Sequence, residues 1–125
     1  MKTLDECSSD EALSFIHLYF ATVDVLIEAL EKYNRLAIES TTSSGRSQYR
    51  ALALETERDL ELLKNQRRAF LSNDKAINPP SKETVEASKL LAANLAKIVA
   101  KDAKANAIIA LATQALDAFN KVLSA

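Results

Sequence analysis

One imidazole and three carboxylates share a face of the first predicted helix, and their types and spacing come nearest to a metal site. The set is His17, Asp24, Glu28 and Glu31. Carboxylate-bridged di-metal sites in helical bundles use Glu-x-x-His pairs whose ligands point into the core. His17 is the only histidine and residue 14 is a serine, so this pair is missing. We interpret the set as a solvated polar strip, and we expect no metal site and no cofactor.

The only cysteine, Cys7, precedes the same helix. The positive end of a helix dipole lowers the pKa of a nearby thiol and makes it a better nucleophile. A cysteine nucleophile also needs a base. His17 lies ten residues further on, roughly 80° around the helix and two to three turns away, so the two side chains do not meet within one chain. We therefore expect no catalytic residue here, and one cysteine cannot form an internal disulfide.

Basic side chains gather in the second predicted helix without the pattern of a nucleic-acid surface. They are Arg46, Arg50, Lys64, Arg67 and Arg68. Four acidic residues between positions 55 and 61 alternate with them, and no aromatic stacking platform accompanies them. The whole chain has a formal charge of −1. We expect no nucleic-acid binding, and one glycine excludes a Gly-rich phosphate loop.

Length and composition indicate one helical domain. The chain has 125 residues, of which 48% are hydrophobic and 26% charged, as is ordinary for soluble globular proteins. With one glycine and two prolines, it has few turns and therefore few, long elements. The first residues lack the basic-then-apolar order of a signal peptide. We predict an all-α fold, a single domain over residues 1–125, and a cytoplasmic protein.

Capping and breaking signals divide the chain into three predicted helices. Ser8 and Glu11 have the spacing of a capping box. The polar stretch 40–45, which contains the only glycine, ends the first helix, and Pro79 and Pro80 prevent the second from continuing. Ser81 is placed to cap the third. We predict helices over about 9–39, 47–72 and 81–123, which run up, down and up because both connections are short.

The third predicted helix is too long for the other two. At 1.5 Å per residue the three helices measure roughly 45, 39 and 63 Å, so about 20 Å of the last one overhangs. Its final third is rich in large apolar residues, and a second stripe consists of alanines that allow close helix contact. An apolar helix end of this kind is unfavourable in water, so another protein surface should pack against it. We expect either a kink that folds the helix back or a second copy of the chain.

The first predicted helix has more apolar surface than a three-helix bundle needs. Apart from its polar strip, its N-terminal two-thirds is apolar over about 240° of arc, whereas a surface helix buries a stripe of about 100°. We predict that the surplus forms a homodimer interface; single apolar residues tolerated on the surface are the alternative. The predicted interface residues, taken from the first and third helices, are Leu18, Val25, Ile108, Leu111, Phe119 and Leu123.

Two polar residues interrupt apolar rows of the kind that pack between helices. Asn34 belongs to a heptad-like row of the first helix that also contains Ile16, Phe20, Val23, Ile27, Leu30 and Ala37. Asp102 interrupts the apolar stripe of the third helix. Single polar residues in such rows fix register or oligomeric state, and the alternative is a place at the edge of the bundle.

Residues 12–30 approach the hydropathy of a membrane span, for which about 20 mainly apolar residues suffice. A span would bury Asp24, Glu28 and His17 in lipid, at about 2.5–3.5 kcal/mol for a charged group at the centre. A helix in a bundle avoids this penalty, so we expect no membrane span.

These patterns favour a non-catalytic interaction protein, namely an adaptor, regulator or accessory subunit that presents apolar helix faces to a partner. The first alternative is a binder of small apolar ligands or lipid tails. Its cavity would be lined by Phe15, Tyr19, Phe20, Leu26 and Tyr33. The second alternative is an enzyme that relies on carboxylates, because one histidine and one cysteine leave few other catalytic groups.

Overall fold

The described part of the chain folds into four α-helices rather than three. The computed structural model describes residues 1–101 and 104–124. After a short 3-10 helix η1 (Leu4–Glu6), the helices are α1 (Ser9–Glu39), α2 (Ser43–Leu71), α3 (Lys82–Ala96) and α4 (Ala105–Leu123). No strand occurs in these ranges, where one isolated bridge joins Lys2 to Ile77. The prediction of an all-α fold is confirmed.

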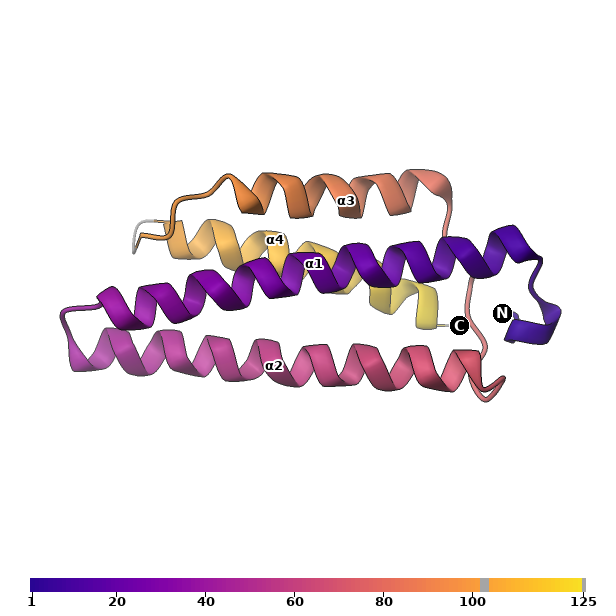
Figure 1. Ribbon diagram of the computed structural model, residues 1–125, viewed down its shortest axis with the longest axis horizontal. Helices are drawn as coiled ribbons and strands as arrows, with labels where there is room; N and C mark the ends of the chain where they lie inside the picture. The colour runs from indigo at the N-terminus through magenta and orange to yellow at the C-terminus, as the bar shows by residue number, and fades with distance from the viewer. Residues whose placement is uncertain (102–103, 125) are drawn as a thin grey trace.

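Helix α1 is the element on which the other three pack. Figure 1 shows α1 and α2 side by side along their length, with α3 and α4 along other sides of α1. Each helix begins at the end of the bundle where the preceding helix finished (Figure 1). Because α1 has neighbours on several sides, much of its wide apolar surface is used within its own chain.

Side-chain caps mark where α1, α2 and α3 begin. The Ser8 hydroxyl accepts a hydrogen bond from the Glu11 amide at 3.1 Å, and the Glu11 carboxylate accepts one from the Ser8 amide at 2.9 Å, which confirms the predicted capping box. The Ser81 hydroxyl accepts from the Thr84 amide at 3.1 Å, so Ser81 caps α3, as predicted. The predicted start of the second helix at residue 47 was wrong. The Thr42 hydroxyl accepts from the Gly45 amide at 3.0 Å, so most of the polar stretch is the cap and first turn of α2.

The prediction of one continuous helix over 81–123 was wrong, because the segment divides into α3 and α4, and the expected fold-back of its final part is found instead. The chain folds back, so that Ile108 and Phe119 of α4 are fully buried against the rest of the molecule. Each large apolar side chain gains about 1.5–3 kcal/mol on burial, whereas helix propensities differ by less than about 0.7 kcal/mol per ordinary residue. The free energy gained by burying the apolar side chains of α4 therefore outweighs the preference of residues 97–104 for a continuous helix. Asp102 lies outside the described residues, as does Ala103 of the alanine stripe.

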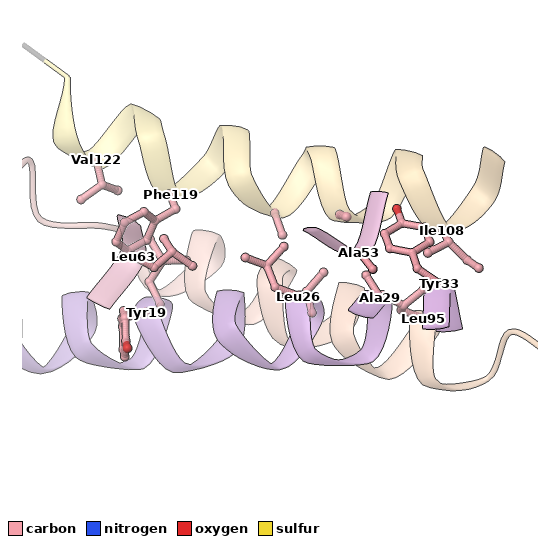
Figure 2. Packing of buried hydrophobic residues seen from close by; sticks show 14 of the residues in the cluster. Tyr19, Leu26, Ala29, Tyr33, Ala53, Leu63, Leu95, Ile108, Phe119 and Val122 are labelled. Atoms are coloured by element: carbon pink, nitrogen blue, oxygen red, sulfur yellow. The ribbon is translucent and has the colours of Figure 1, made fainter. Parts of the chain in front are cut away.

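The core is built around rings from three helices. Phe15 of α1 lies with its ring centroid 4.6 Å from that of Phe70 of α2 and 5.7 Å from that of Phe119 of α4. Figure 2 shows Phe119 and Ile108 of α4 pointing toward α1. All three rings are fully buried because they pack against one another.

The loop between α2 and α3 anchors both ends of the described chain. Asn73 has a left-handed backbone (φ 63°) and ends α2, where the Asp74 amide donates to the Ala69 carbonyl. The Asn73 side chain accepts from the Asp5 amide at 3.1 Å. The Asn78 amide donates to the Val122 carbonyl at 2.7 Å. The segments before α1 and at the end of α4 are thus held at one end of the bundle.

Helix α1 is long and apolar enough to cross a membrane, by length and composition alone. Of the 18-residue window that passes this test, 44% is buried inside the fold. The core helix of a bundle passes the same test, so this property is weak support for a span.

Candidate interaction surface

An exposed apolar row runs along the outer side of α1. Leu13, Phe20 and Ile27, which follow one another at intervals of seven residues, are 51%, 52% and 50% exposed. Ile16, Val23 and Leu30 lie beside them, half-buried against the core. We call these six residues the α1 row. Intervals of three and four residues place all six on one face of the helix, as in the seam of a coiled coil.

Polar residues form the edge of the α1 row on the side of α3. His17 lines a shallow groove together with Lys82 and Lys89 of α3, which places its side of α1 next to that helix. Asp24 and Glu31 follow His17 at intervals of seven residues and are exposed on the same side. Glu31 pairs with Arg35 at 3.6 Å, whereas Asp24 forms no hydrogen bond or ion pair with any described residue. Three members of the predicted strip, His17, Asp24 and Glu31, are exposed, whereas Glu28 is half-buried and pairs with Lys32 at 3.6 Å.

Arg67 of α2 lies on the opposite edge of the α1 row. Its guanidinium carbon is 4.9 Å from the centroid of the Tyr19 ring, and that ring contacts Phe20 of the row with 5.3 Å between centroids. The Nε atom of Arg67 is buried and lacks a hydrogen-bond partner among the described residues. Lys64, one turn earlier, is exposed and 3.5 Å from Glu61. Arg67 is therefore the unpaired positive charge of this edge, because the charge of Lys64 is paired with Glu61.

An open groove lies between α3 and α4, at the end of the bundle where α3 begins. Its volume is about 750 Å³, and it is open to solvent along one side. The apolar part of its lining includes Pro79, Pro80, Leu90, Leu91 and Val122. The polar part includes Asn94, Gln114, Asp117 and Lys121. A mainly apolar groove with a few polar groups is the usual form of a small-ligand site.

Ser88, on the wall of this groove, has a buried hydroxyl without a partner in the described ranges. Two threonines show how such a group is normally satisfied. The hydroxyls of Thr22 and Thr56 are buried in other helices and each donates at 2.8 Å to the carbonyl four residues earlier. An unsatisfied buried hydroxyl is unfavourable by about 1–3 kcal/mol. Ser88 is therefore the one serine or threonine buried in the described core that could gain a partner from a ligand.

Two smaller grooves lie along the contact of α2 with α4. Their volumes are about 150 Å³ and 80 Å³. Tyr33 of α1 lines the smaller one with Glu55 of α2. Burial, with a smaller effect of the Glu55 charge, raises the pKa of Tyr33 to about 12. Tyr33 therefore stays protonated at neutral pH. A groove of about 80 Å³ holds no more than a few water molecules.

Most of the predicted interface residues are used inside the chain. Leu18, Val25, Ile108 and Phe119 are fully buried, so they offer no surface to a second copy. Leu111 and Leu123 are half-buried and pack against the core. The physical reason is that α1 packs on α2, α3 and α4 of its own chain, so the residues assigned to a dimer interface are already covered.

The residues predicted to line a cavity form packed core instead. Tyr19, Leu26 and Tyr33 are buried, as is Phe15, and Figure 2 shows the first three among the other core side chains. Phe20 points out of the core and belongs to the α1 row. None of the five predicted residues lines the groove between α3 and α4.

Cys7 and His17 do not form a catalytic pair. Cys7 is half-buried before α1, and burial raises the pKa of its thiol rather than lowering it. His17 is exposed. Among residues 1–101 and 104–124, no group of three or more His, Cys, Asp or Glu side chains is placed to hold a metal ion. Cys7 and His17 are thus in different surroundings, and neither activates the other.

Comparison of the chain with protein-family models, with curated proteins and with solved structures found no match.

Proposed function

We propose that this chain is a non-catalytic helical interaction protein, an adaptor, regulator or accessory subunit, and that the α1 row is its contact surface. The observation that carries the proposal is the half-exposure of Leu13, Phe20 and Ile27 on one line, backed by three more apolar residues. Isolated exposed apolar residues are common on protein surfaces, but a continuous apolar patch rimmed by charged residues is typical of an interaction site.

A site-specific crosslink tests this function. The full chain is produced in the cells that naturally contain it, with Ile27→p-benzoylphenylalanine in the α1 row or with the same substitution at Asn65. Asn65 is exposed on α2, away from the row, and is the matched control. We expect protein adducts from position 27 after irradiation and few from position 65. An absence of adducts at position 27, or equal adducts at both positions, would contradict the proposal.

Binding of a small apolar ligand is the second candidate function, and the groove between α3 and α4 favours it. The groove has room for a ligand, and the Ser88 hydroxyl could bond to a polar group on it. Organic extraction of the purified protein followed by mass spectrometry tests this function. A stoichiometric apolar compound that is lost in the Leu91→Asp variant but retained in Leu54→Asp, on the exposed side of α2, would support it. A clean extract from the natural chain would refute it.

A further inference from the structure

We infer that the partner on the α1 row is a second copy of this chain, bound around a twofold axis parallel to α1 so that the two α1 helices point the same way. The inference rests on the proposed function, because it names the partner of the same surface. It depends on the charges at the two edges of the row and on the residue that continues the row.

The two edges of the α1 row are unlike. Asp24 lies on the α3 side and is an exposed carboxylate without an ion pair in the described ranges. Arg67 lies on the α2 side, held by its stacking on Tyr19, and it likewise forms no ion pair there. One edge therefore offers an unpaired acid and the other an unpaired base.

Symmetry decides which edges meet when two identical faces come together. A twofold axis parallel to α1 exchanges left and right, so each acidic edge meets the basic edge of the other copy. A twofold axis across α1 makes the helices antiparallel and brings like edges together. Like charges in an interface disfavour that arrangement, and opposite charges favour the parallel one.

The charged groups also match along the helix axis. Arg67 is level with Tyr19, on which it stacks. Asp24 is five residues further along α1, which is roughly 7.5 Å at 1.5 Å per residue. Around a parallel twofold axis every residue keeps its height. Asp24 of one copy is then within reach of the long side chain of Arg67, and of exposed Lys64, in the other copy.

Asn34 continues the α1 row at the next interval of seven residues and is exposed. In parallel coiled coils an asparagine at such a position meets its own copy and fixes both register and the number of chains, at some loss of stability. In an antiparallel pair it would instead face the apolar N-terminal end of the row. The position of Asn34 is therefore consistent with the parallel arrangement chosen by the charges.

The size of the row sets the expected strength. Three half-exposed side chains and their half-buried neighbours amount to an apolar patch of a few hundred Å². A stable standard interface buries about 800 Å² on each partner. The polar edges must contribute the remaining buried area. We therefore expect a reversible dimer with a dissociation constant in the micromolar range.

Light scattering behind size exclusion, over a hundredfold range of concentration, measures the self-association of the natural chain. Cysteine crosslinking then measures its orientation. The variants are Asn34→Cys and the control Asn65→Cys, each with Cys7→Ser, and both replaced asparagines are exposed. We expect a concentration-dependent dimer and mild oxidation to join most Asn34→Cys chains at least tenfold faster than the control.

Charge exchange tests the pairing of the edges. We expect Asp24→Arg to raise the dissociation constant about tenfold, and Arg67→Glu in the same chain to restore it, because opposite edges then meet again. Lys64→Glu is the second compensating variant, because Lys64 is exposed and its replacement leaves the stacking of Arg67 on Tyr19 in place.

Three outcomes would overturn the inference: a monomer at every concentration, equal oxidation of the two cysteine variants, or crosslinks between Leu13→Cys and Asn34→Cys chains, which an antiparallel dimer gives. A monomer whose Ile27 position crosslinks to a different protein would refute the second copy and leave the proposed function standing. Failure of the Ile27 crosslink to any protein would refute the proposed function itself.

Discussion

Replacing Phe119 with alanine tests whether α4 folds back onto α1. The ring is fully buried and lies 5.7 Å from Phe15 and 6.5 Å from Tyr19 between centroids. Burial of the ring is worth about 2–3 kcal/mol, and each ring contact adds about 0.5–1.5 kcal/mol. We therefore expect Phe119→Ala to lower the free energy of unfolding by about 4 kcal/mol, within the usual range of about 3–5 kcal/mol for such truncations.

Urea unfolding followed by circular dichroism at 222 nm measures this loss, with both chains at one protein concentration because a dimer would couple stability to concentration. The melting temperature should fall by about 12–20 °C. Asn120→Ala, at an exposed position next to Phe119, is the control and should stay within about 0.5 kcal/mol of the natural chain. A loss below about 1 kcal/mol for Phe119→Ala would mean that α4 does not pack on α1, and the reasoning for the break would fail.

Three further changes have expected outcomes. Removal of the α1 cap in Ser8→Ala should lower the free energy of unfolding by about 1 kcal/mol in urea, and no loss would show that the capping box is dispensable. Because burial raises the pKa of Tyr33 to about 12, the folded chain keeps this proton where the unfolded chain loses it near its ordinary pKa of about 10. Stability should therefore fall as pH rises from about 10 to 12, and Tyr33→Phe should show a smaller fall when unfolding is measured at several pH values. Since burial raises the pKa of the Cys7 thiol, a thiol reagent should react with it more slowly in the folded chain than in urea, and equal rates would contradict this.

The helix starts were predictable where the signal is local. Ser8 with Glu11 and Ser81 are caps whose partners lie three residues away, and the structure has both. The break between α3 and α4 was not predictable in this way, because no glycine or proline marks residues 97–104. It is decided by the burial of Ile108 and Phe119 against distant parts of the chain. The sequence did indicate that the overhanging, apolar end of the third predicted helix must pack against another surface.

The contact surface was predictable only in outline. The surplus of apolar residues in α1 and the heptad-like row through Phe20 and Ile27 are visible in the sequence. A helical wheel does not say which apolar side faces the chain's own helices, so fully buried Leu18 and Val25 were assigned to the interface. In the sequence Arg67 stood out only as one of five basic residues of the second predicted helix, and Ser88 gave no signal. Arg67 is notable because it stacks on the Tyr19 ring of another helix, and Ser88 because its hydroxyl is buried without a hydrogen-bond partner among the described residues. Both properties depend on distant parts of the chain.

The central place of α1 affects the order of events during synthesis. It is the first of the four helices to leave the ribosome, yet the helix that covers its aromatic end, α4, is the last. At ~5–20 residues per second, the roughly 100 residues between the starts of α1 and α4 take about 5–20 s to emerge. For that interval the aromatic side chains of α1 are not yet packed against α4. A truncation before α4 should therefore leave apolar surface of α1 exposed and be degraded faster than the full chain.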